Sequence, residues 1–141
     1  MEGATGTLDT NYEGKAEAAV SALKRGRDFV YIHLEGPDEC GHHADIEGKI
    51  TAIERIDARI LAPVLDYLHE CGEPYAVMVL PDHPTPVSTM THARDAVPFV
   101  RYCSEGIDMQ YASSHYDERH ATGTGLMIPD GPSLMRRFLG K

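Results

Sequence analysis

Apolar residues recur along the chain with two periods, and these periods predict an alternation of helices and strands. A spacing of three and four residues over 13–25 predicts an amphipathic helix, with Asn11 as its N-terminal cap. The apolar face of this helix consists of Ala16, Ala19, Val20 and Leu23. A short helix is also expected near the end of the chain, over residues 132–139.

The longest periodic pattern begins at Asp45 and ends at Gly72, which predicts one long helix. Its apolar positions are three or four residues apart, so that one face is expected to be apolar throughout. These positions are Ile46, Ile50, Ile53, Ile56, Ile60, Val64 and Leu68. Pro63 is expected to kink or interrupt the helix, because proline lacks the backbone N–H of the helical ladder.

Short runs rich in β-branched and aromatic residues predict buried strands over 28–34 and 74–80 and a third strand over 98–103. The first two flank the long helix, and a strand, helix and strand in this order predict a parallel pair with a right-handed crossover. The loops that follow these two strands should then emerge at the same edge of the sheet, where open α/β sheets carry their chemistry.

Both of these loops contain an aspartate and a histidine. Asp38 and His42 lie four residues apart in the loop expected over 35–44, while Asp82 and His83 are adjacent in the loop over 81–96, and His92 follows in that loop. Carboxylates and neutral imidazoles together suit Mn²⁺, Zn²⁺, Mg²⁺ or Fe. The pattern indicates a divalent-metal site, and two ions a few ångströms apart would suit phosphoryl transfer.

Composition and charge exclude several classes of partner. The chain has 141 residues, which fits one domain, and a formal net charge of −9 argues against nucleic acid as a partner. An apolar run of about 20 residues, which a membrane-spanning helix needs, is not present, and neither is a signal-peptide pattern. We expect no membrane association.

The three cysteines, Cys40, Cys71 and Cys103, form no C-x-x-C pair, so we expect no disulfide framework. We therefore expect a cytoplasmic location. Cys40 lies inside the first loop, where it is either a soft metal ligand or a small filler residue; the second interpretation is favoured because the neighbouring ligands are harder.

The segment Ser113–Asp117 contains Ser, His and Asp. Adjacent residues do not form a catalytic relay, which needs groups from separate segments.

The motifs extend from Thr5 to Phe138 and, in order and spacing, resemble a known family. They are TGTLDTNYEGKAEAA, HLEGPDECGHHADIEGKITAIERID, VLPDHPTP, THARDAVPF and LMRRFL. The run is similar to the C-terminal part of archaeal-type, cofactor-independent phosphoglycerate mutases, which belong to the alkaline phosphatase superfamily. The resemblance implies an α/β fold, a three-layer alkaline-phosphatase-like sandwich with a mainly parallel sheet, present here as a partial domain.

The resemblance also implies a metal-dependent phosphoryl transfer between 3-phosphoglycerate and 2-phosphoglycerate through a phosphoserine. Two divalent ions are expected, typically Mn²⁺, with Mg²⁺, Zn²⁺ or Co²⁺ as alternatives. By this resemblance Asp38, His42 and His92 hold one ion, and Asp82 and His83 help to hold the other. His43 has no assigned role.

The chain departs from the family in one respect, because the family's nucleophile segment and inserted substrate-binding domain are not found in it. Residues 1–141 are therefore expected to be the C-terminal segment of the metal-binding domain, inactive alone, and no serine is nominated as nucleophile. Arg55, Arg94 and Arg101 are candidate substrate contacts that match no known binding residue.

Two alternatives stay open. One is another phosphohydrolase or phosphotransferase of the same superfamily. The other is a non-catalytic metal-binding module that forms a homo-oligomer through apolar surface left exposed by truncation.

Overall fold

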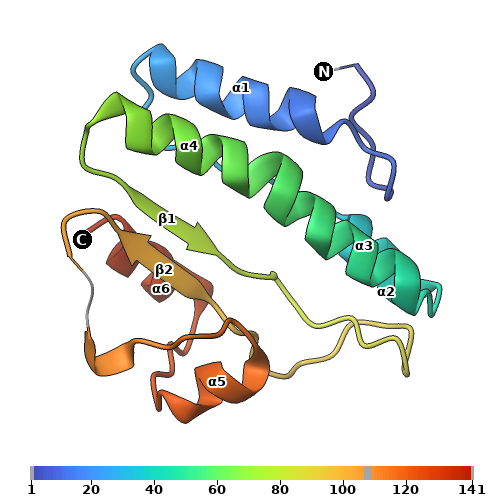
Figure 1. Cartoon of the computed structure of the whole chain (residues 1–141). Helices are drawn as coiled ribbons and strands as arrows, with labels where there is room; N and C mark the ends of the chain where they lie inside the picture. The colour runs from blue at the N-terminus through green and yellow to red at the C-terminus, as the bar shows by residue number, and fades with distance from the viewer. Residues whose placement is uncertain (1, 107–108, 141) are drawn as a thin grey trace. The chain divides into compact units, whose positions relative to one another are not determined.

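The computed structural model describes residues 2–106 and 109–140, and the chain divides into two compact units (Figure 1). The first unit comprises the chain to Glu73 together with the segment Thr85–Ala93. The second comprises Pro74–Pro84 and the chain from Arg94 onward. The long loop after residue 80 is therefore shared, and its middle part, Thr85–Ala93, belongs to the first unit.

Helix α1 spans Tyr12–Lys24 and confirms the first predicted helix. The Asn11 side chain caps it by accepting a hydrogen bond of 2.8 Å from the Gly14 N–H. Tyr12, Ala16 and Ala19 are buried, as expected for the apolar face of an amphipathic helix.

An ion pair ties α1 to the long helical run. The Nε and Nη2 atoms of Arg59 lie 2.5 and 2.7 Å from the two carboxylate oxygens of Glu13, and the guanidinium stacks over the Tyr12 ring at 4.8 Å. The hydrogen bonds from Arg59 lower the pKa of Glu13 below its ordinary value. This two-pronged geometry fixes the register of α1 against its neighbour.

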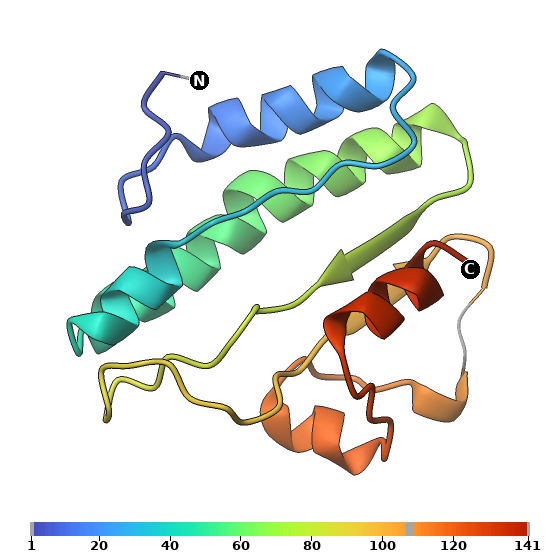
Figure 2. The same ribbon diagram turned by 180° about the vertical axis from the view of Figure 1, so that it is seen from behind.

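The prediction of a buried strand over 28–34 is wrong. Figure 2 shows this segment as an extended ribbon leading from α1 to the next helix, and it is not part of a strand pairing among the described residues. Its exposure alternates: Phe29 and Tyr31 are 45% and 65% exposed, whereas Val30 and Ile32 are half-buried. The sequence pattern was right about extended backbone, but the strand neighbours that would bury both faces are not among these residues.

The prediction of a loop over 35–44 is also wrong in its first part, because Gly36–His42 form helix α2. Pro37 is at the start of this helix, where its missing N–H is harmless and its fixed φ favours a helical turn. Gly41 and Cys40 are buried within it. Two of its seven residues are glycines, which have low helix propensity, so the sequence does not predict this helix.

Helix α3 spans Ile46–Ile56 and begins as predicted, because the Asp45 carboxylate accepts a 2.8 Å hydrogen bond from the Gly48 N–H. The buried face, however, carries Gly48 and Ala52, where small residues allow α3 to approach α2 closely. The predicted apolar stripe is buried at Ile60 and half-buried at Ile56, Val64 and Leu68, but it is exposed along most of α3. Its residues Ile46, Ile50 and Ile53 are 56%, 49% and 55% exposed.

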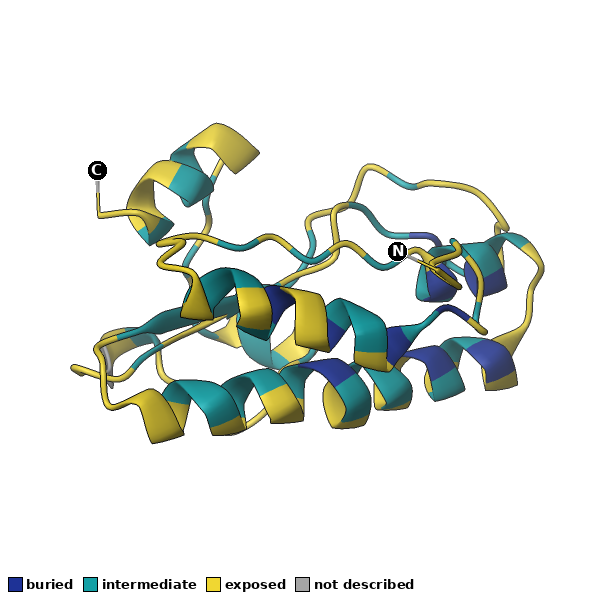
Figure 3. Ribbon diagram, turned by 90° about the horizontal axis from the view of Figure 1, so that it is seen from above, coloured by how far each residue is buried: buried dark blue, intermediate teal, exposed yellow. Residues whose placement is uncertain are grey.

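The long helix is interrupted as expected near Pro63. A π-helical turn, η1, spans Asp57–Leu61, and helix α4 follows over Ala62–Cys71. Pro63 cannot donate to the carbonyl four residues earlier, and a wider turn just before it relieves that mismatch. Gly72 ends α4 in the left-handed conformation with φ of 71°. Most of the buried positions of this unit lie on its helices (Figure 3), and two buried threonines, Thr10 and Thr85, lie in loops.

The second unit contains a two-stranded sheet. Strand β1, Ala76–Val79, pairs with β2, Val100–Cys103, in antiparallel register from Ala76 opposite Cys103 to Val79 opposite Val100. These strands confirm the predicted positions of the second and third strands but correct their pairing. A parallel partner for β1 was expected at 28–34, and that segment is not assigned as a strand.

The described residues of this unit also form three short helices: η2, Met109–Tyr111; α5, Glu118–Gly123; and α6, Gly131–Phe138. Helix α6 confirms the predicted terminal helix, and the Asp130 carboxylate caps it at the Ser133 N–H. In the described part of the chain, none of the helices has the length and apolar character that a membrane crossing requires.

Candidate metal centre

Helix α2 places two of the candidate ligands on one face. Asp38 and His42 are four residues apart, and one helical turn brings their side chains together. The Nε2 atom of His42 lies 3.4 Å from the Oδ2 atom of Asp38. The sequence predicts a loop here, whereas in the structure a helix brings the two side chains together.

The third candidate ligand comes from the segment Thr85–Ala93. The Nε2 atom of His92 lies 3.1 Å from that of His42 and 3.4 Å from Asp38 Oδ1. Within the described residues, ligand atoms of these three side chains all lie within 4.8 Å of one another. The three residues grouped from sequence are thus brought together.

The backbone of the same segment orients His42. The Nδ1 atom of His42 lies 3.0 Å from the carbonyl oxygen of Met90. A carbonyl only accepts, so Nδ1 carries the proton, and in neutral imidazole the lone pair is then on Nε2. That lone pair is directed toward a carboxylate and a second imidazole, an arrangement that fits a divalent cation between them.

A buried threonine orients the carboxylate. The hydroxyl of Thr85 donates a short hydrogen bond to Asp38 Oδ1, and Thr85 is only 5% exposed. Sequence analysis missed this residue. The flanking residues Pro84 and Pro86 could have pointed to it, because a polar residue between two prolines is held in a rigid loop.

Cys40 and His43 do not belong to the cluster. Cys40 is buried where α2 meets α3, and burial raises the pKa of its thiol, which favours the filler interpretation over the ligand. The Nδ1 atom of His43 donates to the Glu39 carbonyl of its own helix at 2.8 Å.

The remaining candidate ligands, Asp82 and His83, belong to the second unit. The Nε2 atom of His83 lies 3.5 Å from Asp82 Oδ2, and the backbone N–H of His83 donates a hydrogen bond of 3.1 Å to Asp82 Oδ1. Adjacent residues in a strand would point to opposite faces. In this bend the two side chains lie side by side.

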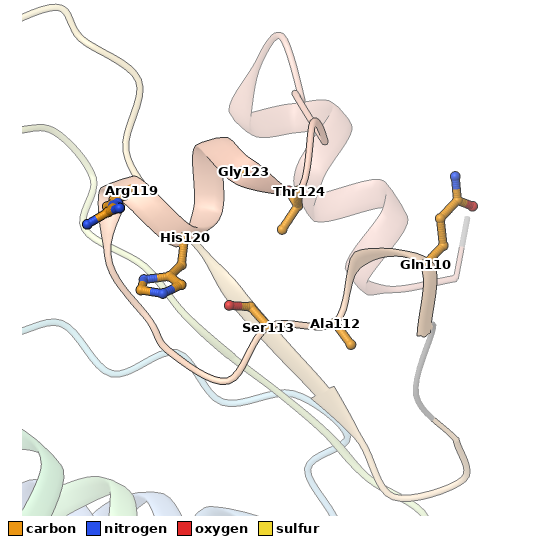
Figure 4. A pocket seen from close by; sticks show the side chains of 7 residues that line it. All are labelled: Gln110, Ala112, Ser113, Arg119, His120, Gly123 and Thr124. Atoms are coloured by element: carbon orange, nitrogen blue, oxygen red, sulfur yellow. The ribbon is translucent and has the colours of Figure 1, made fainter.

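The second unit also contains a wide hollow of about 610 Å³ around α5 (Figure 4). Its lining includes Ser113, His120 and Thr124, and Arg119 lies at its side pointing away from Thr124. The two histidines nearby stack on each other, with their ring centroids 4.6 Å apart. Each has its own hydrogen-bond partner: Asp117 accepts from His120 Nδ1 at 2.8 Å, and Ser114 pairs with His115 at 2.8 Å.

Comparison with known proteins defines the class to which this fold and cluster belong. The profile of the Metalloenzyme superfamily matches residues 1–126, and the chain belongs to that superfamily. A solved structure, that of the PH0037 protein from Pyrococcus horikoshii, superposes with a TM-score of 0.75 at 35% identity, over 86% of this chain and 35% of that one. The fold is metalloenzyme-like and, as expected, alkaline-phosphatase-like, and this chain carries part of it.

Within this superfamily, the chain is similar to one group of curated enzymes. The chain is 51% identical over 135 residues to the 2,3-bisphosphoglycerate-independent phosphoglycerate mutase of Methanosarcina barkeri, covering 96% of this chain and 33% of that protein. It is 43% identical over its whole length to a probable enzyme of the same name from Geobacter sulfurreducens, of which it covers 35%. The chain thus spans about a third of the length of these relatives, and its resemblance to this mutase family is confirmed.

Proposed function

We propose that this chain is the metal-binding, C-terminal third of an enzyme that interconverts 3-phosphoglycerate and 2-phosphoglycerate. The observation that carries the proposal is the cluster of Asp38, His42 and His92 in a chain similar to phosphoglycerate mutases. We also infer a cytoplasmic location, which three unpaired cysteines support.

In this proposal Asp38, His42 and His92 hold one divalent ion, and Asp82 and His83 contribute to a second. Mn²⁺ is the favoured ion, since two imidazoles and carboxylate oxygens make a ligand set of intermediate hardness; Mg²⁺, Zn²⁺ and Co²⁺ are the alternatives. Bound divalent ions supply positive charge that stabilises transferring phosphoryl oxygens.

The chain's own residues prepare the first site. The Met90 carbonyl holds His42 with the Nε2 lone pair toward the cluster, and the Thr85 hydroxyl limits the rotation of the Asp38 carboxylate. With these partners fixed, little side-chain reorganisation is needed when an ion binds.

The nucleophile and the substrate-binding domain lie outside these 141 residues in our proposal, and Arg55 is not free for substrate. Its guanidinium donates to the Leu8 carbonyl at 3.0 Å and lies 3.6 Å from the Asp9 carboxylate. We expect the purified chain alone to show no mutase turnover.

The test compares this chain with a full-length protein in which the same residues are joined to the remaining two thirds of the family sequence. Interconversion of the two phosphoglycerates, followed by phosphorus NMR with Mn²⁺ present, should occur in the full-length protein only. Turnover by the 141 residues alone refutes the fragment assignment. Preferential hydrolysis of other phosphate esters by the full-length protein would instead favour a different activity within the superfamily.

A second candidate function is self-association of a non-catalytic module. The exposed isoleucines of α3, namely Ile46, Ile50 and Ile53, form one stripe at helical spacing and favour it. In that case the partner is a second copy of this chain.

A further inference from the structure

Thr85 links the candidate metal site to helix α3 through its hydroxyl and its backbone carbonyl. Its hydroxyl donates to Asp38 Oδ1, and its backbone carbonyl accepts a 2.7 Å hydrogen bond from the Nζ atom of Lys49. Thr85 is one of two buried polar residues in the described part of the chain. A buried hydroxyl that donates to a carboxylate makes a charge-assisted hydrogen bond, which is stronger than a neutral one.

The ammonium group of Lys49 donates its hydrogen bond to the Thr85 carbonyl. Lys49 extends from the first turn of α3, and in the described part of the chain no carboxylate pairs with its ammonium group. An ammonium directed at a partly buried carbonyl makes a strong hydrogen bond to a backbone group. The interaction therefore anchors one point of the loop backbone, the residue whose side chain holds Asp38.

The fit around Thr85 is tight. A Cβ atom at Gly41, one residue before the ligand His42, would lie 2.5 Å from the Thr85 carbonyl oxygen and 3.0 Å from Lys49 Nζ. Helices α2 and α3 and the Thr85–Ala93 segment thus meet at this carbonyl. The absence of a side chain at Gly41 is what allows the loop to approach the ligand-bearing helix.

We propose that Thr85 and Lys49 are positioning residues for the metal ligand Asp38. Lys49 fixes the Thr85 backbone, and the Thr85 hydroxyl engages Oδ1 so that Oδ2 remains directed toward His42 Nε2, 3.4 Å away. This inference rests on the proposed metal site and adds the residues that orient its carboxylate. It predicts that metal affinity depends on the hydroxyl at position 85 rather than on the shape of that side chain.

The test is Mn²⁺ titration calorimetry on this chain with matched variants. Thr85→Val keeps the shape and removes the hydroxyl, and we expect about a 10- to 100-fold loss of Mn²⁺ affinity, the range typical of groups that orient metal ligands. Thr85→Ser retains the hydroxyl and should stay within about threefold of the wild type. Lys49→Met should weaken binding, whereas Lys24→Met, on α1 beside Tyr67, serves as the matched lysine control.

Two further measurements separate positioning from a purely structural role. Thermal unfolding of the metal-free variants reports loss of structure, which should not follow the order of the Mn²⁺ affinities. If Lys49 acts through Thr85, the double variant should lose little more affinity than Thr85→Val alone. Equal Mn²⁺ affinity of Thr85→Val and wild type overturns the positioning role alone. Failure of the wild type to bind Mn²⁺, Mg²⁺, Zn²⁺ or Co²⁺ overturns the metal assignment and this role with it.

Discussion

The Nε2 atoms of His42 and His92 lie 3.1 Å apart, although fifty residues of sequence separate them. The Met90 carbonyl leaves the His42 lone pair facing His92 and Asp38, so that a cation between them would satisfy all three groups at once. This relationship is the basis of the first prediction.

Removal of either imidazole should abolish the first metal site. We expect His42→Ala and His92→Ala each to weaken Mn²⁺ binding by more than the roughly 10- to 100-fold typical of groups that only orient ligands. His43→Ala is the matched control, because His43 is exposed and bonds only the Glu39 carbonyl of its own helix turn. Calorimetric titration measures the affinities, and equal losses in all three variants would contradict the assignment.

Much of this site was predictable from sequence because its logic is local. A helix cap needs only a few neighbouring residues: the predicted cap at Asn11 is confirmed, and Asp45, where the sequence predicts the next helix to begin, caps that helix. The resemblance to the mutase family grouped Asp38 with His42 and His92, and the structure brings the three side chains together. What sequence did not reveal was the contact of Thr85 with Asp38, since a hydroxyl donor 47 residues away leaves no periodic pattern.

The errors have a common physical cause, which is that burial depends on neighbours. The pattern of residues 28–34 suits a strand buried on both faces, yet Tyr31 is 65% exposed in this chain. Ile50 and Ile53 likewise follow a core-like period without lying in a core. Helix α2 was not predicted because glycine is a poor helix former, and tertiary packing against α3 overrides that preference.

A methyl group at Gly41 should damage the site through the backbone. The added Cβ would come within 2.5 Å of the Thr85 carbonyl oxygen, which has little freedom to move because Lys49 holds it. We expect Gly41→Ala to destabilise the protein by about 1–3 kcal/mol, as overpacking typically does, and to weaken Mn²⁺ binding. Gly131→Ala has open space at its Cβ position and is the control. Equal unfolding midpoints in urea for the two variants would rule out this tight contact.

The ion pair between Glu13 and Arg59 should give a stability contribution that disappears in acid. Hydrogen bonds from Arg59 lower the pKa of Glu13 below its ordinary value of 4.5. The contribution is therefore fully present above that value and is lost as the pH falls through the lower pKa of the folded state. Glu13→Gln should be less stable than wild type in urea at pH 7 and equally stable at a pH where Glu13 is protonated in both states. A difference that persists in acid would mean that the pair's geometry, not its charge, matters.

The three thiols should differ in reactivity. Burial raises the pKa of Cys40 and limits access to it, whereas Cys71 is exposed at the end of α4. With iodoacetamide at pH 8, we expect Cys71 to be alkylated much faster than Cys40, and urea should remove most of the difference. Peptide mass spectrometry assigns the sites. Rapid alkylation of Cys40 in the folded chain would show that the contact between α2 and α3 opens readily.

The isoleucine stripe of α3 gives the final prediction, because about half of each side chain of Ile46, Ile50 and Ile53 is exposed. A contiguous apolar strip on a helix favours association, here with a second copy of the chain. We expect sedimentation analysis to show concentration-dependent self-association of the wild type, and Ile50→Glu to weaken it by placing a charge in the strip. Leu139→Glu is the matched control, since Leu139 is similarly exposed but lies beyond α6 in the other unit. Equal weakening by both substitutions would point to a general effect of charge, and a monomeric wild type would argue against the self-association candidate.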